Sequence, residues 1–515
     1  MKTMYTFLCM ALLACGLNAQ TEPNILWQNA IGGSADDVGY GITKTAGGAT
    51  MVAGRSSSSD GDVPNNNGGI DVWLGALTPN GTLGANIVFG GSSTDIAYDI
   101  QQTSDGGRIF AGRTSSNDGT INGNGGFGGD DFWVVKVDNG FAIEWQFVFG
   151  GSGDDIAESV RETSTGKFIV TGYTNSSALA GHQGGYDVVV MLLNGTTGAA
   201  ESFELYGGSG NDYAYRAEET LDGGYIVAGF TESNDGDVSG NHGMRDGWIF
   251  KLNSIFSMVW QRTHGGTADD VGRDVVYNAD GTIVFVGNSE STDIQGGNQG
   301  GNDIFVVKYD GTGFGYWAGT WGGSGSDVPY TIIETPDNGW LIAASSDSND
   351  GDVTGNHGGI DAWLMRLGPT SAFKWEKSLG GSGLDVARSV VIATGGGYTL
   401  AGYSDSNDGD VSGNNGALDY WVVKLDSDLG VKDFETKHIA IYPNPATGHF
   451  TIDLKQTPEN GVGVSVSNLL GQTVFSTKIN GTHIQIATNA WASGMYFVHL
   501  TNATGESIVE KLIVK

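Results

Sequence analysis

Residues 206–252 read YGGSGNDYAYRAEETLDGGYIVAGFTESNDGDVSGNHGMRDGWIFKL, and this stretch decides the fold because its pattern recurs along the chain. Each copy offers four short runs rich in Val, Ile, Tyr, Phe and Trp, separated by Gly, Asp, Asn and Ser, with no helical period. The Asp222–Gly223–Gly224 sequence favours a tight hairpin, because Asp and Gly tolerate a positive φ. The unit therefore predicts four antiparallel strands.

Seven copies of this unit follow one another at intervals of 57 to 60 residues. Four strands repeated seven times form either an open stack or a closed ring. An open stack needs atypical end units to cover its exposed faces, whereas the first and last copies resemble the middle ones. We therefore predict an all-β fold, a seven-bladed β-propeller. The Gly-Gly pairs that mark the copies begin at Gly32, Gly90, Gly150, Gly207, Gly265, Gly322 and Gly380.

The predicted ring needs a seam between its two ends. Residues 25–31 match the run that precedes each later Gly-Gly pair, and the last copy ends at Leu425 without such a run. We expect residues 25–31 to complete the blade formed by residues 385–425. In the alternative arrangement, each sequence repeat forms a blade of its own.

The chain is strongly acidic. Its 515 residues include 58 Asp and Glu against 25 Lys and Arg, a formal charge of −33. Such a surface repels nucleic acid and anionic membranes, which excludes a DNA- or RNA-binding role. Residues 20–436 carry −35 and residues 437–515 carry +1, so the composition changes near residue 436 and indicates two modules.

The N-terminus has the features of a secretory signal peptide. Lys2 precedes the apolar run 7–14, and Ala19 offers a small residue before the cut. The run is far shorter than the ~20 residues that span a bilayer, and no later segment is long enough, so we expect no transmembrane segment. A lipobox that leaves a lipid-anchored Cys15 is the competing interpretation. Cleavage after Ala19 removes both cysteines, so the mature fold has no disulfides.

Two residue types recur at fixed positions of the unit. Ten of the thirteen tryptophans form two columns, and we expect them to pack between blades because large rings bury the most area. Aspartate fills two positions in all seven copies. A residue present in every copy is typical of a turn device that accepts backbone N–H groups, and not of a catalytic group. These columns are Asp37, Asp95, Asp155, Asp212, Asp270, Asp327 and Asp385, and Asp71, Asp131, Asp187, Asp246, Asp303, Asp361 and Asp419.

Strand parity places the Gly-Gly loops and the longer Asn-Asp-Gly-Asp loops on one face of the ring. We call this the acidic loop face and expect it to carry the binding site, since binding residues concentrate on loops held by a rigid scaffold. Four of its loops carry two aspartates around a glycine, which offers carboxylate oxygens to calcium. Simple solvated turns are the alternative, and we expect no other cofactor. The candidate ligands are Asp60, Asp62, Asp235, Asp237, Asp350, Asp352, Asp408 and Asp410.

Four phrases at the C-terminus, YPNPA (442–446), VSNLLGQ (466–472), WASGMYFV (491–498) and KLIVK (511–515), stand in this order. They resemble the type IX secretion system C-terminal sorting domain of Bacteroidetes. The resemblance implies a small β-sandwich that the outer-membrane translocon reads, on a protein that is shed or held at the cell surface. The matching motif residues are Tyr442, Pro443, Asn444, Pro445, Gly471, Gly494, Tyr496, Lys511 and Lys515.

We therefore expect a signal peptide (1–19), a β-propeller (20–430) similar to bacterial surface propeller repeats, a linker (431–438) and a sorting domain (439–515). No nucleophile elbow, phosphate loop or His-x-x-x-His pair is present. The first functional hypothesis is a non-enzymatic, secreted or surface-displayed protein that binds a glycan or a protein through the acidic loop face. The alternative is a glycoside hydrolase or lyase that uses aspartates of that face. A passive surface protein is a third possibility.

The calcium hypothesis predicts a measurable stabilisation. If the paired aspartates bind calcium, thermal melting of the purified protein will occur at a higher temperature with calcium than with a chelator, because the ion binds only the folded state. Superimposable melting curves would show that these loops are solvated turns.

Overall fold

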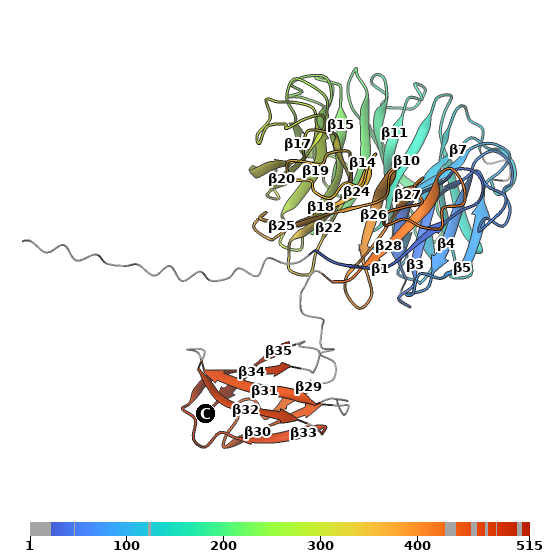
Figure 1. Ribbon diagram of the computed structural model, residues 1–515. Helices are drawn as coiled ribbons and strands as arrows, with labels where there is room; N and C mark the ends of the chain where they lie inside the picture. Colours follow the sequence, from blue (N-terminus) through green and yellow to red (C-terminus); the bar gives the residue numbers. More distant parts are fainter. Residues whose placement is uncertain are drawn as a thin grey trace, which may run out of the picture. The chain divides into compact units, whose positions relative to one another are not determined.

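The computed structural model describes residues 22–45, 47–121, 125–427, 439–454, 461–468, 472–479, 481–501 and 507–515, and all regular elements within these ranges are strands. The chain divides into two compact units, Met1–Asp426 and Ser427–Lys515. Figure 1 shows the sheets of both units. The signal peptide with Cys15, the linker 431–438 and Gly471 of the sorting motif lie outside the described residues.

The first unit consists of four-stranded antiparallel sheets, as the repeat predicts. Three of them are β2 (Asp37–Lys44), β3 (Thr50–Ser56), β4 (Asp71–Leu77) and β5 (Leu83–Phe89); β6 (Asp95–Gln102), β7 (Arg108–Thr114), β8 (Asp131–Val137) and β9 (Ile143–Phe149); and β10 (Asp155–Glu162), β11 (Phe168–Thr174), β12 (Asp187–Leu193) and β13 (Ala200–Tyr206).

Three further sheets repeat this order along the chain. They are β14 (Asp212–Glu219), β15 (Tyr225–Thr231), β16 (Asp246–Leu252) and β17 (Met258–His264); β18 (Asp270–Tyr277), β19 (Ile283–Ser289), β20 (Asp303–Tyr309) and β21 (Gly315–Trp321); and β22 (Asp327–Glu334), β23 (Trp340–Ser346), β24 (Asp361–Leu367) and β25 (Phe373–Leu379).

The last sheet joins the two ends of the unit. It contains β26 (Asp385–Ile392), β27 (Tyr398–Ser404), β28 (Asp419–Leu425) and, next to β28, the N-terminal strand β1 (Ile25–Ile31). Ile25 is opposite Leu425 and Ile31 is opposite Tyr420. The predicted strand exchange is therefore confirmed, and the alternative of one blade per sequence repeat is wrong.

The first strands of the repeats encircle a common axis. Each of β2, β6, β10, β14, β18, β22 and β26 contacts the next one along the chain, and β26 contacts β2. We call these seven the inner strands. The cycle of contacts fits a β-propeller, in which all inner strands run in the same direction beside the axis.

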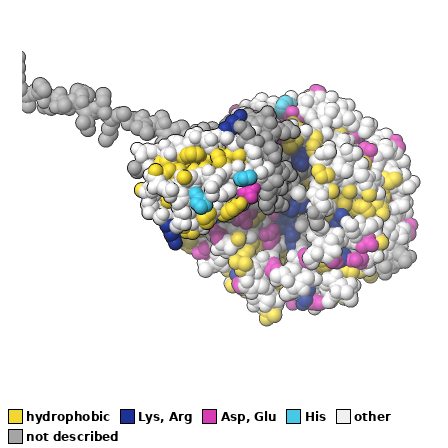
Figure 2. Space-filling model, turned by 90° about the horizontal axis from the view of Figure 1, so that it is seen from below, with side chains coloured by type: hydrophobic (Ala, Val, Ile, Leu, Met, Phe, Trp, Pro, Cys, Tyr) yellow, Lys and Arg dark blue, Asp and Glu magenta, His cyan; other side chains and the backbone are white. Residues whose placement is uncertain are grey.

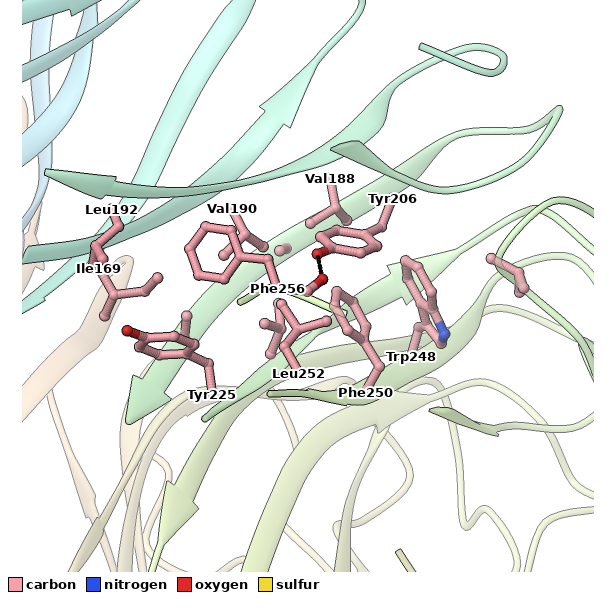
Figure 3. Close-up of a cluster of buried hydrophobic side chains, with 14 residues drawn as sticks. Ile169, Val188, Val190, Leu192, Tyr206, Tyr225, Trp248, Phe250, Leu252 and Phe256 are labelled. Carbon is pink, nitrogen blue, oxygen red and sulfur yellow. Dashed lines mark hydrogen bonds between the residues drawn. The ribbon is translucent and has the colours of Figure 1, made fainter. Parts of the chain in front are cut away.

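Apolar side chains pack between successive sheets. Figure 3 shows one such cluster, in which Val188 and Val190 of β12 face Trp248 and Phe250 of β16. The tryptophan column to which Trp248 belongs is fully buried in every described copy, which confirms the packing prediction for it. Its members are Trp73, Trp133, Trp248, Trp363 and Trp421.

The second tryptophan column links neighbouring sheets at their outer strands. The Trp145 indole N–H donates to the Gly195 carbonyl at 3.1 Å, and its ring covers Gly198 so closely that a Cβ there would lie 2.4 Å from it. Trp260 has the same relation to Gly311 and Gly313. This column also packs between sheets, as predicted.

Both aspartate columns hold loops together. In the β14 copy, Asp212 Oδ2 accepts hydrogen bonds from the Gly208 amide at 2.8 Å and the Ser233 hydroxyl at 2.7 Å. Asp246 Oδ2 accepts from the amide of His242 at 2.9 Å. Equivalent bonds occur in all seven copies, which confirms the turn-device interpretation.

The C-terminal unit contains two sheets. Both contribute to one apolar core, with Phe450 and Ile452 from the first and Val464 and Val498 from the second. The sheets are β29 (Ile439–Tyr442), β30 (His449–Leu454) and β33 (His483–Ala487); and β32 (Thr473–Ile479), β31 (Val462–Asn468), β34 (Gly494–Thr501) and β35 (Ser507–Val514).

A methyl group at the first glycine of a Gly-Gly pair will destabilise the propeller. A Cβ at Gly207 would lie 2.3 Å from Asp187 Oδ1 and 2.7 Å from Asp212 Oδ2. We expect Gly207→Ala to lower the free energy of unfolding by about 3 kcal/mol, the upper range for overpacking, measured by denaturant unfolding. Gly311→Ala is the control because its Cβ would meet no atom closer than 3.6 Å. Equal effects of the two changes would contradict the prediction.

The buried aspartates also predict a dependence of stability on pH. Burial raises the pKa of Asp303 to about 6, so its ionisation opposes folding progressively between about pH 4, its value in an unfolded chain, and pH 6. In Asp303→Asn the amide stays neutral. The melting temperature of the variant minus that of the wild type should therefore rise from pH 4 to pH 6 and then level off.

The control for this experiment is Asp310→Asn. A hydrogen bond from Thr312 lowers the pKa of the Asp310 carboxyl, so this exchange brings no gain in stability over the same pH range. A pH-independent difference between Asp303→Asn and the wild type would contradict the burial argument.

Candidate functional site

A β-bulge interrupts each inner strand at the same place. In β2 the pairing with β3 shifts between Gly39 and Gly41, which leaves Tyr40 without a partner residue. The other six inner strands shift at the equivalent position. A bulge redirects a side chain, and here it turns seven side chains toward the axis. We call them the axial ring: Tyr40, Tyr98, Glu158, Tyr215, Arg273, Tyr330 and Arg388.

All members of the axial ring line one cavity of ≈150 Å³. The ring combines four tyrosines, two arginines and one glutamate, although the aspartate three residues earlier is the same in every strand. The repeats thus share the residues that build the scaffold and differ in the residues that face the axis. This departure from symmetry marks the cavity as the candidate functional site.

Arg388 is held between two tyrosines. Its guanidinium carbon lies 4.1 Å from the ring centre of Tyr330 and 5.1 Å from that of Tyr40, and Tyr40 in turn packs edge-on against Tyr98 at 5.3 Å. Within the described part of the chain, the guanidinium of Arg388 has no hydrogen-bond acceptor and no carboxylate within 4.0 Å. Its five N–H donors are therefore free for a ligand.

Glu158 provides the negative charge of the ring. Burial raises the pKa of Glu158 to about 7, against the opposing effects of Arg388, a hydrogen bond with Tyr173, and Arg273. Arg273 uses its Nε–H to bind the Asn288 amide oxygen at 3.0 Å. A carboxyl that titrates near neutral pH is suited both to binding a cation and to accepting a proton.

A layer of ion pairs forms the floor of the cavity. Arg216 follows the bulge residue of β14 and binds both carboxylate oxygens of Asp274, at 2.6 and 3.1 Å. Asp274 Oδ2 also accepts from the hydroxyl of Thr331 and the amide of Ile332, both at 2.9 Å. Asp99 accepts from Arg161 and from the amide of Val160. These interactions link neighbouring inner strands, and they occupy the side chains of Arg216, Asp274 and Asp99.

A second cavity of ≈320 Å³ lies beyond this floor, toward the hairpin turns. Asp99, Arg216, Thr331 and Ser389 line both cavities. Figure 2 shows Lys and Arg side chains, in dark blue, toward the middle of the visible face of the first unit. The linings of the two cavities hold five basic and five acidic side chains, so the axis is balanced in charge although the chain as a whole is strongly acidic.

The predicted calcium loops lie away from the axial ring. Asp235 Oδ1 accepts from the Ser209 amide at 2.7 Å, and Asp237 Oδ2 from the Gly207 amide at 3.2 Å. Asp60, Asp350 and Asp408 make the same bond as Asp235, and Asp62, Asp352 and Asp410 the same bond as Asp237.

These bonds tie each long loop to the Gly-Gly loop beside it. No group of three or more metal-ligating side chains is found among the described residues. Calcium binding by these loops stays a prediction that the chelator experiment tests.

The motif residues of the C-terminal unit come together around its last strand. The Asn444 amide donates to the Lys511 carbonyl at 2.7 Å and its Oδ1 accepts from the Ile513 amide at 2.9 Å. Tyr496 is buried, and its hydroxyl donates to the Ala492 carbonyl at 2.8 Å. The remaining described motif residues lie in the sheets or beside them: Tyr442 ends β29, Pro443 and Pro445 follow it, Gly494 opens β34, Lys511 lies in β35, and Lys515 follows β35.

The secretion system C-terminal sorting domain is the family whose model matches this chain, over residues 440–515. Residues 440–515 are a type IX sorting domain. The sorting domain directs the protein through the type IX secretion system to the outer cell surface or to the surrounding medium. None of the described segments forms a helix that is long and apolar enough to cross a bilayer.

A curated relative is the endo-acting ulvan lyase of Formosa agariphila, 38% identical over 78 residues. The match covers 15% of this chain and 15% of the relative, so the chain spans only a small part of the lyase that it matches.

Two solved structures show a loose likeness. The WD40 domain of Neurospora crassa Pan2 has a TM-score of 0.41 and 11% identity, covering 77% of this chain and 95% of that chain. The extracellular domain of BT3049 from B. thetaiotaomicron has a TM-score of 0.36 and 10% identity, covering 93% of this chain and 55% of that chain. The arrangement described above rests on strand pairing and not on these likenesses.

The sequence analysis placed the candidate site in the loops, which stays a prediction, and it did not identify the axial ring as a second candidate. A signal was present, because the third residue after the Asp that opens each inner strand changes from copy to copy while its surroundings repeat. Simple alternation along a strand does not reveal that this residue faces the axis, since the bulge changes the alternation at that point.

Proposed function

We propose that this protein is a secreted or surface-displayed seven-bladed β-propeller with a small β-sandwich as its sorting domain, and that it binds a ligand in the axial cavity. The observation that carries the proposal is the guanidinium of Arg388, which lies between two tyrosine rings and has no acceptor among the described residues. The ligand is an acidic glycan or an acidic group of a protein, and its anionic group is what Arg388 binds.

The chemistry of Arg388 supports an anionic ligand. A guanidinium offers two parallel N–H donors that match a carboxylate or a sulfate. The flanking tyrosines fix the orientation of the guanidinium before a ligand arrives, so little freedom is lost on binding. The loop aspartates of the acidic face are engaged with backbone amides, which makes the axial ring the better binding site.

The same observation argues against a passive surface protein. A half-buried charge without a hydrogen-bonded partner destabilises a fold. Selection for stability alone would favour an acceptor beside Arg388, as Arg216 has in Asp274. A guanidinium that lies at a cavity without an acceptor is therefore better explained by a ligand that supplies the acceptor.

An enzymatic role is the second candidate, and Glu158 is the observation in its favour. A carboxyl whose pKa is near 7, across a cavity from an arginine that binds carboxylates, is placed to remove the proton next to a uronate carboxyl group, the first step of a lyase. A glycoside hydrolase needs a second free carboxyl group, and Asp99 and Asp274 are both paired with arginine. The likeness to the ulvan lyase covers too little of the chain to add support.

Removing the free guanidinium should abolish binding of acidic ligands. We expect the wild-type protein to bind oligogalacturonate or a sulfated oligosaccharide, and Arg388→Gln to weaken that binding at least tenfold, about 1.4 kcal/mol, by titration calorimetry. Arg262→Gln on β17 is the control, since it removes the same charge away from the axis.

A screen for turnover on the same acidic oligosaccharides decides between binding and lyase activity. New ultraviolet absorbance from an unsaturated product that disappears in Glu158→Gln would establish the enzyme. Equal affinities of wild type and Arg388→Gln, or no binding of any acidic oligosaccharide, would overturn the proposed site.

A further inference from the structure

Glu158 and Arg388 stand on opposite sides of the axial ring. Arg388 belongs to the sheet that contains β1 and β26–β28, and Glu158 belongs to the β10–β13 sheet, three places away in a cycle of seven. Arg273, on the β18–β21 sheet, lies two places from each of them in this cycle. No cation lies within the 4.0 Å of an ion pair from Glu158 among the described residues. The opposite charges thus attract each other across the cavity without touching.

We propose that the axial cavity binds a small zwitterion, with its carboxylate on Arg388 and its ammonium group on Glu158. This inference rests on the proposed function, in which Arg388 holds an anionic group. It adds a positively charged group of the ligand, which Glu158 binds.

A ligand with one charge fits these walls poorly. A simple anion at Arg388 faces the carboxylate of Glu158, and a simple cation at Glu158 faces two arginines. A zwitterion places an opposite charge against each wall, and these contacts are stronger among partly buried side chains than at a fully exposed surface.

The four tyrosines of the ring suit the positive pole. The face of an aromatic ring attracts a cation, and several such faces around one carboxylate are the usual way to bind a methylated ammonium group. Part of this attraction is already used within the ring, because Arg388 lies over Tyr40 and Tyr330. Arg273 likewise lies over Tyr215, at 5.4 Å. Tyr98 remains for the ligand, and it interacts electrostatically with Glu158.

Size and net charge agree with this ligand class. The cavity of ≈150 Å³ has room for a small amino acid or a betaine. A chain with a net charge of −33 repels anions at long range. A neutral zwitterion approaches without this repulsion.

The test is a ligand series measured by titration calorimetry on the full chain. Glycine, glycine betaine and γ-aminobutyrate vary the distance between the two charges and the methylation of the nitrogen. Acetate and tetramethylammonium each carry one of the charges. We expect at least one zwitterion to bind ten times more tightly than either single-charge ligand.

Variants test which side chain binds each charge of the ligand. Arg388→Gln and Glu158→Gln should each weaken zwitterion binding at least tenfold, and Glu158→Gln should leave acetate binding unchanged or stronger. Arg262→Gln again serves as the control. Should Glu158→Gln fail to fold, the ligand series on the wild-type chain still decides the matter.

Different failures have different meanings. Acetate that binds as tightly as every zwitterion, with dependence on Arg388, would overturn this inference and leave the proposed function in place. Tetramethylammonium binding that is unaffected by Arg388→Gln would replace both with a cation site. Failure of the whole series, together with failure of the acidic oligosaccharides, would overturn both proposals.

Discussion

The pairing of β1 with β28 is the constraint on which the rest of the first unit depends. It joins residues that are nearly 400 positions apart in the chain, and it completes the sheet whose inner strand, β26, lies against β2. Without this pairing, the inner strands would form an open row with two exposed ends. The axial cavity exists because the row is closed, so one antiparallel strand pair determines whether there is a site at all.

Closure also explains how a symmetric scaffold can hold an asymmetric site. The buried aspartates, the glycine pairs and the fully buried tryptophans recur because every sheet meets its neighbours in the same way. The residues of the axial ring have no paired residue in the adjacent strand, because each is the extra residue of a bulge. These positions are therefore free to differ between repeats. Four tyrosines, two arginines and a glutamate are arranged there without disturbing the packing between sheets.

The arginines of the chain are concentrated near the axis, where carboxylates also lie. Acidic side chains cover the loops, where they accept backbone hydrogen bonds or meet solvent. Of the ten arginines of the chain, four line the two axial cavities: Arg161, Arg216, Arg273 and Arg388. Arg161 and Arg216 are bound by aspartates and hold the inner strands together. Arg388 lies one layer away without an acceptor among the described residues, and this contrast with Arg161 and Arg216 is what makes it a candidate for ligand binding.

Much of this architecture follows from the sequence by itself. The period of the Gly-Gly pairs determines the number of sheets, the missing run after Leu425 determines the strand exchange, and the tail motifs determine the export route. These features are local or repeated, so a pattern in the chain is enough to detect them. The axial ring was decided only by the tertiary structure. Its members come from seven strands spread over some 350 residues, and only the closed ring brings them together. The bulge at Tyr40 and its counterparts then breaks the alternation of the strand, so which side chain faces the axis depends on pairing with the neighbouring strand.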